Sequence, residues 1–309
     1  MLPWRRRTYP PARTEADPER RGCLRHNRRL SGADHLGGDS VLKRILLTVE
    51  YDGTAYAGWQ RQLNAVGVQQ VLEEKLSEAC GHPVTVTGSS RTDAGVHALD
   101  QRVHFDTGCT IPPDKFPFVL NNLLPPDIRV QEGREVPAAF HARFLSAGKT
   151  YTYRILNRRH GTALWRNTCW HVPVPLAAAP VEEALRSLPG THDFSAFQAA
   201  GGTAKTTIRT LSEARLAIRD AEWILTVTGN AFLYNMVRII AGTVVEIGLG
   251  KRAPDAFDRA FSSLNRLDLG MTAPAHGLEL TRVYYPEKAF LNPESLRWHD
   301  PEEDVPCFD

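Results

Sequence analysis

Several features that mark common protein classes are missing from this chain of 309 residues. It has no uncharged apolar run of about 18 residues, so we expect no membrane span. Its five cysteines are scattered and form no Cys-x-x-Cys pair, which argues against a disulfide framework and favours a reducing compartment. The first residues lack the apolar segment of a secretory signal. We therefore expect a cytoplasmic protein.

The common motifs for nucleotides and metals are also missing. The stretch Gly201-Gly-Thr-Ala-Lys-Thr206 lacks the glycine that precedes the lysine of a P-loop. No third glycine follows Gly248-Leu-Gly250 at the spacing of a dinucleotide-binding turn. The 11 histidines form no zinc-binding pattern with the cysteines. We therefore expect no metal and no nucleotide cofactor.

The net charge of +2 is small, but it is unevenly distributed. Residues 1–40 contain nine arginines and five acids, and they have no hydrophobic period, so they are predicted to be a disordered basic extension. That extension is either a dispensable tail or an arm that tethers RNA. The other 269 residues hold 28 basic and 30 acidic side chains. Net charge therefore says little about what the body of the chain binds.

Apolar periodicity in the body alternates between strand and helix patterns. Strands are predicted over residues 44–51, 84–87, 99–105, 128–136, 149–157, 168–172, 207–218, 222–228 and 278–285. Helices are predicted over residues 68–79, 116–124, 181–188, 231–247 and 254–264. This mixture indicates an α+β fold, with helices on one face of a mixed, largely antiparallel sheet. We expect two similar subdomains, residues 41–147 and 148–286, followed by an acidic tail, residues 287–309.

One loop concentrates reactive side chains. It runs from Gly88 to His97 between two predicted strands and places Arg91 and Asp93 two residues apart. Gly88 and Gly95 permit positive φ angles and close backbone approach, and loops held by strands commonly carry catalytic groups. The alternative is a structural turn in which the Asp93 side chain caps its own backbone.

A basic residue in an apolar helix points to the same loop. Arg238 lies between Val237 and Ile239, and a buried arginine is uncommon unless it is paired. Glu246 is eight residues away, too far for the usual pairing along one helix. An acid from a structured loop elsewhere in the chain is therefore a good candidate for its partner. Alternatively, the arginine reaches solvent at the helix surface.

A third element combines aromatic and basic side chains. Tyr151 and Tyr153 share one face of a predicted strand and are flanked by Lys149 and Arg154. This pattern suits base stacking beside phosphate contacts. It also suits an ordinary sheet face, because tyrosine favours strands.

These residues, taken in order, resemble the TruA family of tRNA pseudouridine synthases. The resemblance extends from about Arg44 to Tyr285 and excludes the basic extension. The chain departs from the family pattern at Ser90, where the family usually has glycine, and at Ala139, where it commonly has an acid. The matching segments are Glu50-Tyr-Asp-Gly53, Gly58-Trp-Gln-Arg-Gln62, Val68-Gln69, Arg91-Thr-Asp-Ala-Gly-Val-His-Ala98, Phe140-His-Ala-Arg-Phe144, Lys149-Thr-Tyr-Thr-Tyr153, Asn230-Ala-Phe232, Met236-Val-Arg238, Ala273-Pro-Ala275 and Gly277-Leu278.

The resemblance implies a pseudouridine synthase fold with an active-site cleft between the subdomains. It implies isomerisation of uridine at positions 38, 39 and 40 of the tRNA anticodon stem-loop, by a homodimer. Asp93 matches the catalytic aspartate, Arg238 its paired arginine and Arg91 the arginine associated with base flipping. Tyr151 matches the active-site tyrosine, which also contacts substrate. Phe232 and Leu278 lie in family segments and are predicted to bind substrate.

Two other functions remain open at this point. A non-catalytic tRNA-binding or folding module would explain the aromatic and basic residues, and a nucleoside hydrolase would use Asp93 differently. A tRNA enzyme also needs a local basic groove, which net charge does not report. Its predicted contributors are Arg61, Lys149, Arg154, Arg158, Arg159, Lys205 and Arg209.

Overall fold

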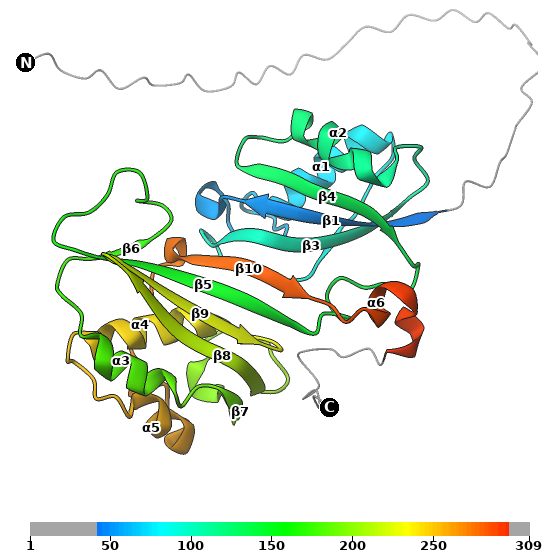
Figure 1. The fold of residues 1–309 in the computed structure, drawn as a ribbon. Coiled ribbons are helices and arrows are strands. Elements are labelled where there is room, and N and C mark those ends of the chain that lie inside the picture. Colours follow the sequence, from blue (N-terminus) through cyan, green and yellow to red (C-terminus); the bar gives the residue numbers. More distant parts are fainter. Residues whose placement is uncertain (1–41, 297–309) are drawn as a thin grey trace, which may run out of the picture. The chain divides into compact units, whose positions relative to one another are not determined.

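The computed structural model describes residues 42–296 (Figure 1). The predicted basic extension and the end of the acidic tail lie outside these residues. Within the described part of the chain, no helix is both long and apolar enough to cross a lipid bilayer.

The centre of the fold is one continuous sheet of ten strands. Its main path runs β4-β1-β3-β10-β5-β9-β8-β7, while β2 pairs with β3 and β6 with β5. Most neighbours are antiparallel, and the exceptions are β3 with β10 and β5 with β6. The strands are β1 (Lys43–Tyr51), β2 (Thr87–Gly88), β3 (His97–Thr107), β4 (Ile128–Val136), β5 (Gly148–Asn157), β6 (Trp170–Val172), β7 (Gly190–Asp193), β8 (Ile208–Arg219), β9 (Glu222–Gly229) and β10 (Leu278–Tyr284).

Strand β10 connects the two halves of this sheet (Figure 1). Its residue Leu280 pairs in parallel with Ala98 of β3 and in the antiparallel sense with Tyr151 of β5. The last strand of the fold therefore lies between strands from the first and second halves of the chain. The predicted boundary near residue 148 stays a prediction.

The helices explain why one face of the sheet is apolar. Helices α1 (Val68–Cys80) and α2 (Phe116–Leu123) contribute to the same buried cluster as α3 (Ala178–Leu185), α4 (Met236–Gly248) and α5 (Ala256–Ser263). Alternate residues of β1, such as Ile45 and Leu47, point into this cluster, because successive side chains of a strand face opposite sides. Leu46 joins a smaller cluster with Ala289 of the short helix α6 (Lys288–Leu291). The predicted α+β class is confirmed.

Several predicted elements have different limits in the structure, and one strand was not predicted. Only residues 87 and 88 of the predicted strand 84–87 pair with a neighbour, so β2 is shorter. The predicted helix 231–247 begins at Met236, because Asn235 adopts a left-handed backbone that α-helix geometry excludes. Strand β7 was not predicted, since its four residues carry no apolar alternation.

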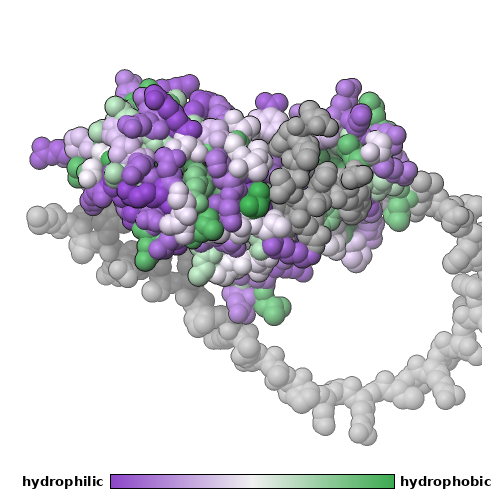
Figure 2. All heavy atoms as spheres, turned by 90° about the horizontal axis from the view of Figure 1, so that it is seen from below, coloured by the Kyte–Doolittle hydropathy of each residue, from purple (hydrophilic) through white to green (hydrophobic). Residues whose placement is uncertain are grey.

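The molecular surface is predominantly polar on the face drawn in Figure 2. Hydrophilic side chains predominate there, and apolar side chains occur singly or in small groups. Scattered apolar residues of this kind are normal on a folded protein. The coloured part of this face therefore shows no broad apolar surface.

Candidate active site

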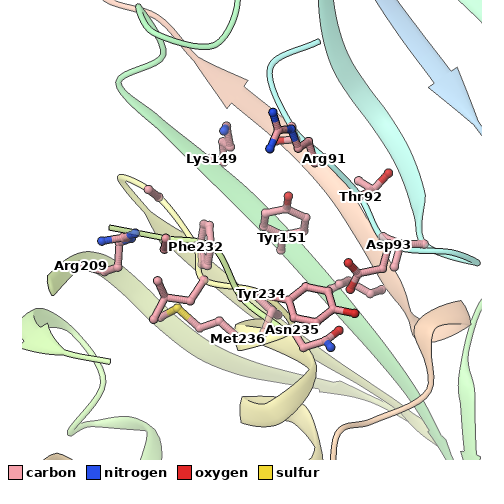
Figure 3. Close-up of a pocket in the computed structure, with 18 of the residues that line it drawn as sticks. Arg91, Thr92, Asp93, Lys149, Tyr151, Arg209, Phe232, Tyr234, Asn235 and Met236 are labelled. Carbon is pink, nitrogen blue, oxygen red and sulfur yellow. The ribbon is translucent and has the colours of Figure 1, made fainter. Parts of the chain in front are cut away.

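A pocket of about 230 Å³ collects nearly all of the predicted site residues (Figure 3). Arg91 and Asp93 enter from the loop before β3, and Tyr151 enters from β5. Phe232 and Leu278 complete the set that lines the pocket. Segments that are distant in the sequence therefore meet at one site.

Close packing fixes the start of the loop that carries Arg91 and Asp93. Gly88 lies against the indole of Trp59, where an added Cβ would lie 2.6 Å from the ring. The Trp59 amide donates a hydrogen bond to the Thr92 carbonyl at 3.0 Å. Gly95, at the other end, has a φ of +78°, a conformation that glycine adopts readily. The contact with Trp59 therefore explains the glycine at position 88, and the positive φ explains the glycine at position 95.

Polar contacts fix the middle of the same loop. The Ser90 amide donates to Gln101 Oε1 at 3.0 Å, and Gln101 Nε2 donates to the Ser90 carbonyl at 2.7 Å. Lys149 Nζ donates to the Ser89 carbonyl at 2.8 Å. The hydroxyls of Tyr51 and Thr92 are 2.7 Å apart. These buried bonds hold the loop rigid, as a preorganised site requires.

Asp93 and Arg238 form the ion pair that the buried arginine suggested. Arg238 Nη1 donates to Asp93 Oδ2 at 3.2 Å, and their side chains are 18% and 23% exposed, respectively. Arg238 therefore does not extend into solvent. Glu246 pairs instead with Arg252, at 2.6 Å. The hydrogen bond of the Asp93 carboxylate goes to Arg238, which contradicts the self-capping alternative.

Helix stability does not explain the position of Arg238. It is the third residue of α4, where a cation opposes the helix dipole. Burial raises the pKa of Asp93, and Arg238 only partly offsets this effect. The carboxylate is thus held in a place where its charged form is disfavoured, a frequent property of functional acids.

Tyr151 forms an aromatic wall of the pocket. Its ring meets Phe232 edge to face, with centroids 5.0 Å apart. Burial raises the pKa of Tyr151 to about 12, Ser90 opposes this rise, and the charge of Asp93 adds to it. The phenol is therefore neutral near pH 7.

The predicted basic groove stays a prediction, and two of its residues lie at the pocket. Lys149 and Arg209 line it, whereas Arg61 pairs with Glu73 of α1. Arg154 pairs with Glu222, at 3.0 Å. The sequence alone does not pair Arg61 and Arg154 with these acids, because the fold brings them together.

Other lining residues were missed as site residues. Arg143 belongs to one of the segments that match the family, but its place at the pocket depends on tertiary structure. Asn235 lies three residues before Arg238, a spacing that brings side chains together on a helix. Residues 201–204, considered only as a failed P-loop, also line the pocket. In the described residues, no group of three or more His, Cys, Asp or Glu side chains is arranged to hold a metal ion.

Comparisons with known proteins agree with this arrangement. A family model described as tRNA pseudouridine synthase matches residues 47–145 and 184–286. The tRNA pseudouridine synthase A of Ruminiclostridium cellulolyticum is 46% identical over 79% of this chain and 100% of its own length. The corresponding proteins of Thermoanaerobacter sp. and Acetivibrio thermocellus are 43% and 44% identical over the same shares.

A solved structure of a Cbf5-Nop10-Gar1 complex aligns with 76% of this chain and 48% of its own chain. Its TM-score of 0.33 and identity of 13% are too low to support a conclusion about this fold. The family match and the sequence relatives define the class, which is that of the pseudouridine synthases. Within that class, the chain belongs to the TruA family.

Proposed function

We propose that the chain isomerises uridine to pseudouridine at positions 38, 39 and 40 of the tRNA anticodon stem-loop. The observation that carries this proposal is the Asp93–Arg238 pair at 3.2 Å beside an aromatic wall. In the reaction the N1–C1′ bond breaks, uracil turns, and C5 bonds to C1′; C5 then loses its proton and N1 gains one, with no net oxidation or reduction. A paired carboxylate in a small pocket supplies what this chemistry needs from the protein.

The target uridine must leave the base stack before it reaches the carboxylate. The pocket volume of about 230 Å³ suits one flipped nucleotide better than a larger ligand, for which sites of about 300–1,000 Å³ are typical. Tyr151 and Phe232 would stack against the base and retain it while it turns, with Leu278 as an apolar contact. Exposed Arg91 would fill the space left in the stem.

Asp93 would act in its ionised form, which Arg238 favours electrostatically against the effect of burial. Addition to uracil C6, attack at C1′ and abstraction of a ribose proton are all compatible with this geometry. Neutral Tyr151 would act as a stacking and hydrogen-bonding group, since its raised pKa disfavours a phenolate. Exposed Arg91 and half-buried Arg143 line the pocket and would face the RNA phosphates.

The test is incubation of the purified chain with unmodified tRNA transcripts, followed by mapping of each uridine. Pseudouridine at positions 38, 39 or 40 supports the proposal. Release of free uracil would identify a hydrolase instead. Tight binding without a chemical change would identify a tRNA-binding or folding module.

We also propose that the working form is a cytoplasmic homodimer that binds one tRNA across both subunits. Light scattering during gel filtration measures the mass of the free chain and of its tRNA complex. A monomer in both samples would contradict the proposed assembly without affecting the proposed chemistry.

A further inference from the structure

The residue immediately before α4 has an unusual backbone. Asn235 has a φ of +61° and a ψ of +9°, and it is one of three non-glycine residues with positive φ in the described part of the chain. A left-handed backbone is disfavoured for most residues that carry a Cβ; asparagine is one of the few that adopt it, and glycine adopts it with less strain. Such strain at a functional site is often part of its mechanism. The side chain of Asn235 therefore needs its own explanation.

That side chain does not perform the usual task of an asparagine before a helix. In this position asparagine ordinarily accepts a hydrogen bond from an amide of the first turn, but Asn235 makes no such bond. Its Oδ1 instead accepts from Arg238 Nη1 at 2.6 Å. The helix is closed by its backbone alone, where the Ile239 amide donates to the Asn235 carbonyl at 2.9 Å.

Two short bonds determine where the Arg238 guanidinium points. Nε donates to the Ala273 carbonyl at 2.8 Å, and Nη1 donates to Asn235 at 2.6 Å. The same Nη1 reaches Asp93 at the longer distance of 3.2 Å. These two bonds are shorter than the bond to Asp93, so they fix the orientation in which the Arg238 guanidinium meets Asp93.

We propose that Asn235 is a positioning residue, which holds the Arg238 guanidinium in the orientation that pairs with Asp93. This inference rests on the proposed function, which gives Asn235 no part. It explains why an asparagine occupies a position that glycine would fill with less strain. It also explains why the Asn235 amide oxygen accepts a hydrogen bond from the Arg238 side chain and not from an amide of the helix.

Several titratable groups surround Asp93 besides Arg238. On β5, burial raises the pKa of both Tyr151 and Tyr153. The charge of Asp93 adds to this effect at Tyr151, and the charge of Arg238 opposes it at Tyr153. Tyr234 and Arg91 also line the pocket (Figure 3). The other cationic residues that line the pocket are Arg143, Lys149 and Arg209.

Of these groups, only Arg238 has a direct ion pair with Asp93 in the described residues. If Arg238 loses its alignment, burial acts on Asp93 with less opposition. Its carboxylate then stays protonated to a higher pH. Loss of Asn235 should therefore reduce activity more in acid than in alkali.

Two substitutions of Asn235 separate this role from a structural one. Asn235→Gly removes the amide and tolerates the left-handed backbone, so we expect the variant to fold. Asn235→Asp retains the size and adds a carboxylate that competes for Arg238. With tRNA as substrate, we expect kcat/KM to fall about tenfold at about pH 6 in Asn235→Gly, and less at about pH 8. Asn235→Asp should show the same trend with a larger loss at the lower pH.

Asp220→Gly is the matched control. Asp220 also has a positive φ, of +54°, but it lies in the turn between β8 and β9 rather than at the pocket. We expect its pH profile to match that of the unmodified chain. An equal loss at both pH values in Asn235→Gly, or no loss, would overturn the proposal.

A second measurement does not require activity. The titration midpoint of the Asp93 carboxyl carbon is followed by NMR in chains with labelled aspartate, and Asp93→Asn assigns the signal. We expect both Asn235 variants to titrate at higher pH than the unmodified chain, and an unmoved midpoint would refute the positioning role. A moved midpoint in a protein that forms no pseudouridine would refute the proposed function alone.

Discussion

Replacement of Asp93 by asparagine should abolish the reaction without reducing stability. At 3.2 Å and an effective dielectric constant of about 20, attraction to Arg238 amounts to about 5 kcal/mol. Burial nevertheless outweighs this attraction, because the pKa of Asp93 is raised on balance. Neutralising the side chain therefore relieves a net penalty. We expect Asp93→Asn to be more stable than the unmodified chain at about pH 7.

The sign of this effect depends on pH. A carboxyl group whose pKa is raised in the folded state contributes stability below its unfolded pKa, and this contribution is lost as the pH rises through the folded pKa. The advantage of Asp93→Asn should thus shrink as the pH falls from about 7 toward about 4. Urea unfolding at several pH values measures it. A loss of about 3–5 kcal/mol at pH 7, the usual result of breaking a buried pair, would refute the reasoning.

Asp106→Asn is the matched control with the opposite sign. Arg44 donates to both Asp106 carboxylate oxygens at 2.7 Å, and this contact lowers the pKa of Asp106. Neutralising Asp106 should therefore reduce stability at about pH 7, and the loss should disappear as the pH falls through the pKa of Asp106. For activity, Asp93→Asn should lower turnover at least about 10³-fold and leave tRNA binding intact. Turnover at the unmodified rate would contradict the catalytic assignment.

Three further measurements test other parts of the site. Tyr151→Phe retains the ring contact with Phe232, and it should bind tRNA normally but turn over about tenfold more slowly, because it loses the hydrogen bond of the hydroxyl; equal rates would limit Tyr151 to packing. The logarithm of tRNA affinity should fall with the logarithm of salt concentration with a slope of about −1.5 if Arg91 and Arg143 each neutralise a phosphate, whereas a flat response would contradict phosphate contacts at the pocket. A chain that starts at residue 41 should retain its activity within about twofold, because the pocket lies wholly within residues 89–278; complete loss would make the extension part of the enzyme.

Periodicity predicted most of the fold because the buried strands and helices have clear apolar repeats. The limits failed where a single backbone angle decided the outcome, as at Asn235, which ends the helical path in a run of otherwise suitable residues. Strand β7 was missed because its pairing with β8 depends on a neighbour rather than on its own apolar pattern.

The candidate site was predictable to a similar degree. A cation in an apolar helix needs a partner, so the sequence predicts an acid from a distant loop. In the structure, Asp93 lies beside Arg238. The balance between burial and that cation could not be predicted, because desolvation depends on the surrounding packing. The groove stays a prediction, and the acids that pair with Arg61 and Arg154 are brought near them only by the fold.

The central place of β10 has a consequence for the order of folding during synthesis. Until residues 278–284 leave the ribosome, β3 and β5 each lack the neighbour that joins the two halves of the sheet. Unpaired strand edges favour aggregation, so a nascent or truncated chain is exposed to that risk until its final strand inserts. The same strand brings Leu278 to the pocket, so a chain cut short before it has neither a joined sheet nor a finished site.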